Sequence, residues 1–215
     1  MKKVVMVVPS FSAKGGIASV VNGYRGSELE KKYKIKYIES YCDGSKVKKI
    51  CKAMEAYFLF FKEMAINKPD LVHIHSSFGG SFYRKLPFVY IANIFNVPVI
   101  NHIHGSEIAN FYINASNKKK RLVEDCFNRC KYLAVLSEEW KNNLQVVKTN
   151  TSKVVIENYS IIHKECLKRK NHEDKIILFL GFITELKGVF DIPDIAKKII
   201  ERNRNVKFVL AGSGE

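Results

Sequence analysis

Short apolar segments rich in β-branched residues alternate along the chain with longer segments of helical periodicity, and this alternation restricts the fold more than any other feature. Continuously apolar strands that are separated by helices are typical of a parallel sheet buried on both faces. The sequence therefore predicts a doubly wound α/β protein. The expected strands cover residues 3–8, 35–38, 71–74, 97–103, 132–136, 154–156, 176–180 and 207–211.

Helical segments fill the intervals between these strands, and one of them has a second interpretation. Residues 46–67 begin with several lysines and then contain Tyr57, Phe58, Phe60 and Phe61. Such a helix could rest on an anionic membrane, but aromatic stripes are more often core, which favours packing on the sheet. The expected helices cover residues 16–29, 47–67, 83–95, 118–129, 138–147 and 189–203.

The composition changes after residue 156, where charged residues follow one another without apolar periodicity. This change predicts a linker at residues 161–174 between a first domain, residues 1–160, and the beginning of a second, residues 175–215. The second part offers two strands and one helix, which are too few to bury a core of their own. We therefore expect an incomplete second domain.

The chain carries 36 lysines and arginines against 21 aspartates and glutamates, and its net charge of +15 favours an anionic partner. A phosphate-bearing substrate, an anionic membrane surface and nucleic acid would all satisfy this charge. The basic clusters lack interleaved aromatic residues and nucleic-acid-binding motifs, so we expect no nucleic-acid partner. Solvated helix faces and loops explain the clusters equally well.

Five cysteines without a Cys-x-x-Cys pair indicate neither a disulfide framework nor a thiolate zinc site. They are typical of reduced thiols in the cytoplasm. The apolar run near the N-terminus is too short for a signal peptide, and no stretch of about 18 uninterrupted apolar residues could cross a membrane. We expect a soluble or peripheral cytoplasmic protein.

Two neighbouring glycines, Gly15 and Gly16, separate the first expected strand from the first helix. Glycine lets a backbone approach a ligand closely, and the exposed amides at a helix start suit an anion. The segment matches neither a P-loop nor the Gly-x-Gly-x-x-Gly dinucleotide motif. A plain tight turn is therefore an equally good interpretation.

Two His-x-His elements stand at strand ends, His73 with His75 and His102 with His104. Alternation places both histidines of a pair on one face of the sheet, and open α/β sheets bind ligands at the carboxyl ends of their strands. The histidines could hydrogen-bond a polar substrate or act on it as acid and base, could ligate a catalytic metal, or could be satisfied core residues. A substrate site is favoured.

The metal alternative predicts a hydrolase that uses the His-x-His pairs. Such a site usually includes a carboxylate, and only Asp70 and Glu107 lie close by in the sequence. The residues therefore disfavour a metal site but leave it open. A third motif lies in the second part of the chain, where Lys187 and Gly188 follow a strand and precede a helix. This lysine could clamp a diphosphate beside exposed helix-start amides, or could simply be a solvated loop residue.

In order and spacing, these segments resemble the GT4-type retaining glycosyltransferases of the GT-B fold, and the resemblance covers nearly all of the chain. The segments that carry it are GGIASVV, PDLVHIHS, VPVINHIHGSEI, YLAVLSEEW, KVVIENYSI, IILFLGFITELKGVFDI and VKFVLAGSGE. The resemblance implies two Rossmann-like domains, of which the second is incomplete, with a nucleotide-sugar between them. It also implies transfer of a sugar from a UDP- or GDP-linked donor to an acceptor hydroxyl, with retention and without a metal or other cofactor.

The resemblance also implies roles for individual residues. His104 corresponds to a histidine beside the transferred sugar and is the expected catalytic residue, and Lys187 corresponds to a lysine that binds donor phosphate. The other expected donor-binding residues are Gly15, Gly16, Gly212 and Gly214. Ser137 and Asn158 fall in segments that line the interdomain cleft, and His75 and Glu107, from the histidine segments, complete the expected acceptor side.

The sequence departs from the family pattern at three places. Phe182 stands where many relatives have an arginine that also contacts phosphate, so that the clamp would depend on Lys187 alone. Tyr159 replaces the glycine that usually follows the asparagine. The family's glutamate pair, used for the donor sugar and ribose, would lie beyond Glu215.

The family and the basic charge together predict a setting for the activity. A lipid-linked or saccharide acceptor at the inner face of the bacterial cytoplasmic membrane, in the synthesis of capsule, O-antigen or exopolysaccharide, would suit the charge. The alternative is a truncated or split-gene product that retains an acceptor-side domain without catalysis. Oligomeric state, donor sugar and linkage are not indicated by the sequence.

Overall fold

The computed structural model describes residues 1–159, 175–203 and 205–214, and the chain divides into two compact units, Met1–Ser160 and Ile161–Glu215. The linker expected at residues 161–174 lies outside the described residues. Each unit is therefore described by itself.

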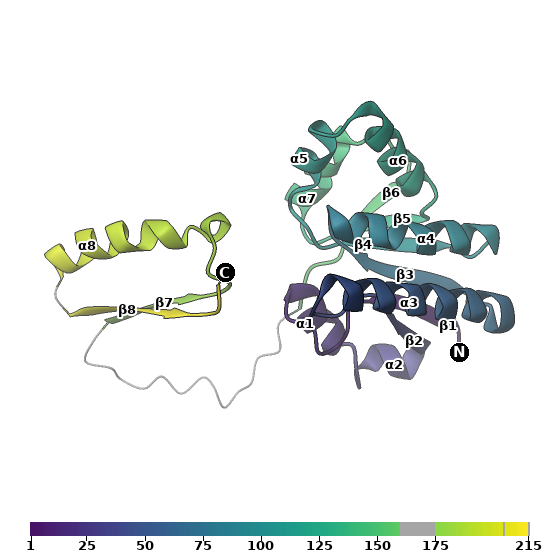
Figure 1. Ribbon diagram of the computed structural model, residues 1–215, viewed down its shortest axis with the longest axis horizontal. Helices are drawn as coiled ribbons and strands as arrows, with labels where there is room; N and C mark the ends of the chain where they lie inside the picture. The colour runs from purple at the N-terminus through teal and green to yellow at the C-terminus, as the bar shows by residue number, and fades with distance from the viewer. Residues whose placement is uncertain (160–174, 204, 215) are drawn as a thin grey trace. The chain divides into compact units, whose positions relative to one another are not determined.

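The first unit is built on a six-stranded parallel sheet in the order β2-β1-β3-β4-β5-β6 (Figure 1). This arrangement confirms the predicted α/β parallel sheet. The strands are β1 (Lys3–Val8), β2 (Lys34–Glu39), β3 (Leu71–Ser76), β4 (Val99–Ile103), β5 (Tyr132–Val135) and β6 (Ser152–Val155).

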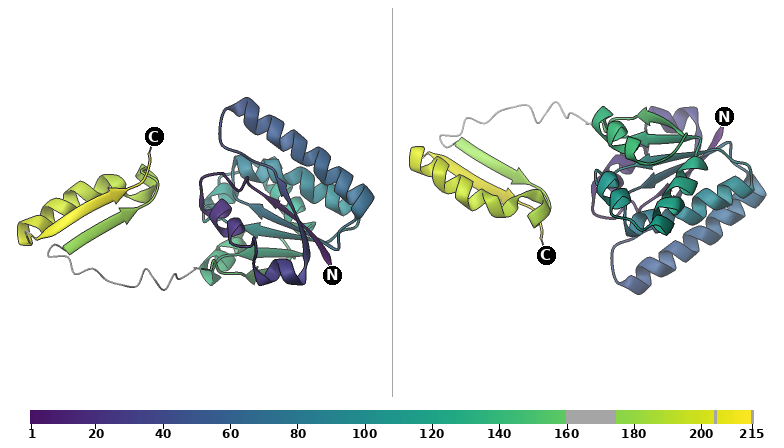
Figure 2. Two further views of the ribbon diagram at one scale, coloured as in Figure 1. Left: turned by 90° about the horizontal axis from the view of Figure 1, so that it is seen from below. Right: turned by 90° about the horizontal axis from the view of Figure 1, so that it is seen from above.

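Helices cover both faces of this sheet (Figure 2). In β1, Val5 and Val7 belong to the large core under α3, α4 and α6, whereas Val4, Met6 and Val8 belong to a smaller core under α1. Strand β1 is thus apolar on both faces, as a central parallel strand requires. The helices are α1 (Gly16–Asn22), α2 (Glu28–Lys32), α3 (Lys46–Asn67), α4 (Gly80–Ile94), α5 (Ile108–Ile113), α6 (Asn117–Asn128) and α7 (Glu138–Asn143), which a 3₁₀ turn continues at Leu144–Val146.

The prediction of a single helix at residues 16–29 is wrong, because the chain forms two helices there, α1 and α2. Helix α1 ends before Gly23, and Gly26 then adopts a positive φ of 70°. Ser27 caps the next helix by accepting a hydrogen bond from the Leu29 amide at 3.2 Å. Glycine favours a turn and serine favours a helix start, so the two local preferences divide the segment.

The second unit pairs β7 (Lys175–Leu180) with β8 (Val206–Ala211) in parallel, with α8 (Ile192–Arg202) between them in sequence. The helix expected from residue 189 begins later, because 3₁₀ turns at Glu185–Lys187 and Val189–Asp191 precede it. Among the residues described in either unit, no helix is long and apolar enough to cross a membrane.

Candidate functional site

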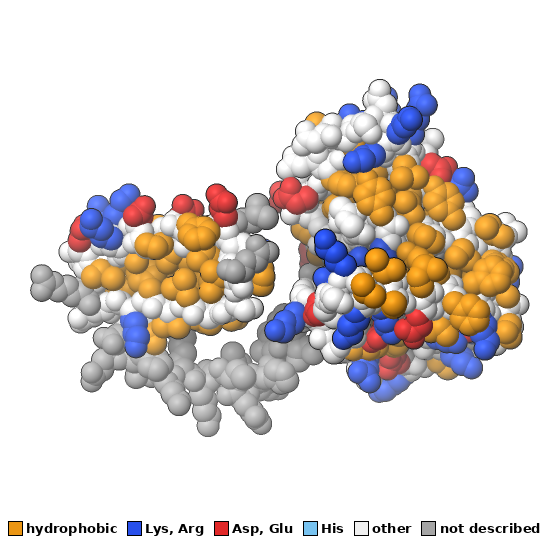
Figure 3. All heavy atoms as spheres, in the orientation of Figure 1, with side chains coloured by type: hydrophobic (Ala, Val, Ile, Leu, Met, Phe, Trp, Pro, Cys, Tyr) orange, Lys and Arg blue, Asp and Glu red, His pale blue; other side chains and the backbone are white. Residues whose placement is uncertain are grey.

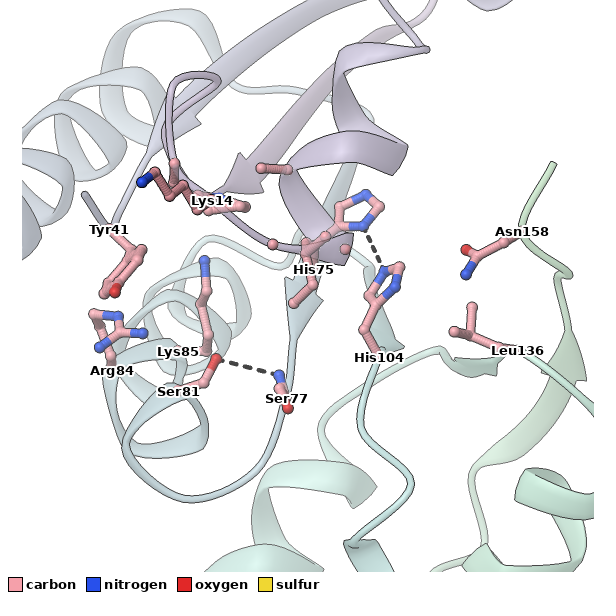
Figure 4. Close-up of a pocket in the computed structure, with 16 residues that line it drawn as sticks. Lys14, Tyr41, His75, Ser77, Ser81, Arg84, Lys85, His104, Leu136 and Asn158 are labelled. Atoms are coloured by element: carbon pink, nitrogen blue, oxygen red, sulfur yellow. Dashed lines mark hydrogen bonds between the residues drawn. The ribbon is translucent and has the colours of Figure 1, made fainter. Parts of the chain in front are cut away.

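A pocket of about 390 Å³ opens at the carboxyl ends of the central strands of the first unit (Figure 4). Pro9, Ser77, His104 and Leu136, which line it, are the residues that directly follow β1, β3, β4 and β5. A parallel sheet brings these strand ends to one edge, which is where open α/β sheets bind ligands. The fold itself therefore places the pocket.

Four histidines form a hydrogen-bonded group on the α1 side of the sheet. The strand register pairs His75 with His102. His75 Nδ1 lies 2.9 Å from His104 Nε2, and His73 Nε2 lies 3.3 Å from His102 Nδ1. The two histidines of each His-x-His element thus lie on one face of the sheet, and the pairing of β3 with β4 brings the two elements together there.

Burial keeps these imidazoles neutral near pH 7. It lowers the pKa of His73 and of His104 to about 3, and that of His102 to about 4. Burial, reinforced by His73 and His104, also holds the pKa of His75 well below its usual range. A group with so low a pKa is a weak general base, so His75 and His104 are suited to hydrogen-bonding a polar ligand in the neutral state.

Three of the histidines could also hold a metal ion. His73, His75 and His102 each offer a ring nitrogen, and these atoms lie within 4.8 Å of one another. The group includes no carboxylate, and His73 and His102 are already hydrogen-bonded to each other. The Nε2 atoms of His75 and His102 are buried without a hydrogen-bond partner among the described residues.

The glycine turn between β1 and α1 opens directly onto the pocket. Gly15 has φ 140°, which a side chain rarely permits, and within the described part of the chain nothing lies within 4 Å of where a Cβ would stand at Gly15 or Gly16. The Lys14 amide donates to Asp43 Oδ2 at 2.8 Å and holds the turn in place. The two glycines thus leave free space for a ligand beside the backbone.

No protein-family model matches the chain, and no curated protein matches its sequence significantly. Solved structures do resemble it. Sucrose-phosphate synthase from Thermosynechococcus elongatus superposes with a TM-score of 0.59 at 8% identity, over 98% of this chain and 71% of that protein. S. aureus MnaA, solved with UDP, gives 0.59 at 14% identity over 98% and 61%, and S. aureus TarM, solved with UDP among other ligands, gives 0.55 at 17% identity over 74% and 32%.

These neighbours and the chain share a fold of the GT-B type. At such low identities the likeness establishes the fold alone. The chain spans 61% of MnaA and 32% of TarM, and is thus shorter than either.

On this GT-B frame the pocket brings together five of the expected site residues, Gly15, Gly16, His75, His104 and Asn158. Two other expected residues of the first unit do not line it. Ser137 instead caps α7, where its hydroxyl accepts a hydrogen bond from the Trp140 amide at 3.2 Å. Glu107 is exposed, and its Oε2 accepts a hydrogen bond from Asn110 Nδ2 at 3.0 Å.

The other three expected residues lie in the second unit. Lys187 is exposed at the end of a 3₁₀ turn, before Gly188 in the left-handed conformation. Gly212 and Gly214 pass close to the loop after β7, where a Cβ on Gly212 would stand 1.8 Å from the Gly181 carbonyl oxygen. Close backbone contact therefore requires glycine at 212, whether or not a nucleotide binds there.

The sequence interpretation missed a group of polar residues on the opposite wall of the pocket. They come from the turn after β1, from the loop after β2 and from the first turns of α4 (Figure 4). The signal for them was the spacing of serine, arginine and lysine at the start of a helix that directly follows the first His-x-His strand. The group consists of Lys14, Tyr41, Ser81, Arg84 and Lys85.

Proposed function

We propose that the protein is a glycosyltransferase that moves a sugar from a UDP- or GDP-linked donor to an acceptor hydroxyl with retention, and that needs no metal. The observation that carries the proposal is the neutral His75–His104 pair beside the open Gly15–Gly16 turn, at the strand ends of a GT-B-type fold. Two structures of this fold, MnaA and TarM, were solved with UDP, which supports a nucleotide-linked donor.

In this proposal His104 hydrogen-bonds a hydroxyl of the transferred sugar as a neutral imidazole. Departure of the nucleoside diphosphate builds negative charge, and donors aimed at that charge stabilise the transition state more than the ground state. The amides at Gly15 and Gly16 and the ammonium of Lys187 would supply such donors. Gly212 and Gly214 would lie near the nucleotide, and Asn158 would contact the substrates from the first unit.

The test is release of nucleoside diphosphate from a panel of UDP- and GDP-sugars, measured with the full chain and a set of saccharide and lipid-linked acceptors. We expect His104→Asn to lower kcat by at least about a hundredfold, because it removes hydrogen bonds made in the transition state. Lys118→Met, an exposed lysine on α6, is the matched control and should leave the rate unchanged. Equal rates for His104→Asn and wild type would refute the assignment.

Two further measurements distinguish the alternative reactions. The anomeric configuration of the product, determined by proton NMR on the first turnovers, distinguishes retention from inversion. A chelator distinguishes the transferase from a metal-dependent hydrolase, which the His73–His75–His102 group could support. We expect full activity in the presence of chelator, whereas loss of activity that zinc restores would favour the hydrolase.

We further propose that α3 docks the protein on an anionic membrane, where surface polysaccharide would be made. The inner face of α3 packs in the core through Ala56, Phe60 and Met64. Its outer face carries an exposed apolar stripe at helical spacing, and Figure 3 shows hydrophobic side chains beside Lys and Arg on this side of the first unit. The stripe consists of Val47, Ile50, Met54, Phe58 and Phe61, with lysines at positions 46, 48, 49, 52 and 62 of the same helix.

An apolar stripe beside lysines fits the boundary between acyl chains and anionic headgroups. The test is flotation with vesicles of phosphatidylcholine alone or with about a third phosphatidylglycerol. Wild type should float with the anionic vesicles, and Ile50→Ser/Phe58→Ser should remain at the bottom. Ile113→Ser, an exposed apolar residue of α5, should float like wild type. Equal flotation of all three proteins would contradict the proposal.

A further inference from the structure

The first turns of α4 present three polar side chains to the pocket. Ser81, Arg84 and Lys85 are three and four residues apart, a spacing that returns to the same side of a helix. Lys85 is only 5% exposed, and its Nζ donates a hydrogen bond to the buried hydroxyl of Ser40. The Arg84 guanidinium lies 4.8 Å from the centre of the Tyr41 ring, which fixes its plane against the wall.

Within residues 1–159, 175–203 and 205–214, neither Lys85 nor Arg84 forms an ion pair. Arg84 Nε is buried and has no hydrogen-bond partner among the same residues. A charged group is rarely buried unless it is paired, because the loss of hydration is costly. Burial, and then the nearby Arg84, hold the pKa of Lys85 well below its usual range.

An anion seated between these groups would supply the missing partner. The cations line the pocket wall opposite His104 and Asn158, as Figure 4 shows. In the proposed function the Gly15–Gly16 amides hold the donor diphosphate at the start of α1, whereas Lys85 and Arg84 line the same pocket from α4. A second cationic group, across the pocket from the point of sugar transfer, therefore calls for a second anion on the other substrate.

We propose that Lys85 and Arg84 bind a phosphate or carboxylate group of the acceptor, so that the pocket selects an anionic acceptor over a neutral one. This inference deepens the proposed function and rests on it. Either oxyanion would favour the protonated form of the Lys85 amine, which burial alone disfavours, and would accept the hydrogen bonds that an ammonium and a planar guanidinium donate. The Ser81 hydroxyl lines the same wall and can donate a further hydrogen bond.

The first experiment measures binding without turnover, so it does not depend on the proposed reaction. The full chain is titrated with inorganic phosphate by calorimetry at low salt. Lys85→Met and Arg84→Gln should each weaken binding by at least about tenfold, the loss of one hydrogen bond to a charged group. Lys118→Met, which removes an exposed positive charge, should change it less than about twofold. Equal affinity in all four proteins would overturn the proposal.

Because Lys85 is buried, each variant is first checked by circular dichroism and thermal unfolding. If Lys85→Met fails to fold, Arg84→Gln, whose side chain is only partly buried, decides the result alone. Two further probes, glycerol 1-phosphate and glucuronate, separate a phosphate from a carboxylate. The oxyanion whose affinity falls in the variants is the group that the pocket recognises.

A titration with UDP distinguishes an acceptor-binding site from a donor-binding site. The acceptor assignment predicts that UDP neither displaces phosphate from this pocket nor binds more weakly to Lys85→Met. Displacement by UDP together with weaker UDP binding in that variant would assign the cations to the donor and overturn the proposal. Failure of the transferase assay with intact phosphate binding would instead count against the proposed function and leave the anion site in place.

Discussion

The two units differ in how completely they cover their apolar residues. In the first unit, Phe60, Phe88 and Ile74 are fully buried between helices and sheet. In the second unit, Leu178 is 57% exposed and Leu180 is 79% exposed, and Val189 is the one hydrophobic residue that is buried among those described there. The pocket of the first unit therefore lies on a closely packed frame, whereas Lys187 lies in a 3₁₀ turn after a strand whose apolar side chains are largely exposed within the described residues.

The largest expected effect on stability comes from removing a buried aromatic side chain from the core of the first unit. Phe60→Ala should lower the free energy of unfolding of the first unit by about 3–5 kcal/mol, because it leaves a cavity against Phe88. Leu180→Ala should change it by less than about 0.5 kcal/mol. Denaturant unfolding followed by fluorescence of Trp140, the one tryptophan, reports on the first unit. Comparable losses in the two variants would show that the stability of the first unit depends on the packing of the second.

The four histidines should make the free energy of unfolding of the first unit depend on pH. The pKa values of His73 and His104, about 3, and of His102, about 4, lie below the unfolded value of about 6.5. The unfolded chain therefore takes up protons first as the pH falls. The stability present above pH 6.5 is then lost toward pH 4, by up to about 1.4 kcal/mol per pH unit for each histidine.

Urea unfolding at pH 7.5, 6.5 and 5.5 should show this loss, with the smaller part of it between the two higher values. In His73→Asn the slope between pH 6.5 and 5.5 should be shallower than in wild type, because one of the titrating imidazoles is absent. A flat profile down to pH 5.5 in wild type would mean that the imidazoles are not buried as neutral groups.

The smallest effect on global stability is expected at the end of the second sheet. Gly212→Ala places a methyl group against the Gly181 carbonyl, so the backbone of β7 and β8 must separate there. Hydrogen exchange measured by mass spectrometry should rise at residues 181–183 and 211–214. The unfolding of the first unit, followed by Trp140, should stay within about 0.5 kcal/mol of wild type. A large change in that unfolding would show that the units are energetically coupled.

Much of the fold could be predicted from local patterns, because strand composition and helical spacing are properties of the chain itself. The same patterns predicted that the two histidines of each His-x-His element would share a face, whereas the contact of His75 with His104 depends on β3 and β4 being neighbours in the sheet. The division between α1 and α2 could have been predicted from Gly23, Gly26 and Ser27, but the apolar periodicity of the segment obscured it. Local turn chemistry was the stronger influence there.

The cationic wall could not be predicted in the same way. Whether Lys85 is solvated or buried depends on the packing of α4 against the sheet and on Ser40 at the end of β2, which lies 45 residues before Lys85 in the sequence. The sequence also could not decide whether the aromatic side chains at positions 46–67 pack in the core or contact a membrane. The structure shows that Phe60 lies in the core and that Phe58 points to solvent, so that one helix contains both kinds of surface.

The positions of Pro9, Ser77, His104 and Leu136, one residue beyond their strands, have a consequence for how the protein can change. The residues that pair the strands end where the residues that line the pocket begin, so the chemistry of the pocket and the pairing of the strands are encoded in adjacent but separate stretches. Substitutions confined to these loops can alter what the pocket accepts while every strand retains its partners. A library that varies the loop positions around Pro9, Ser77 and Leu136, and keeps His104, would therefore change the chemistry of the pocket at little cost in correctly folded protein.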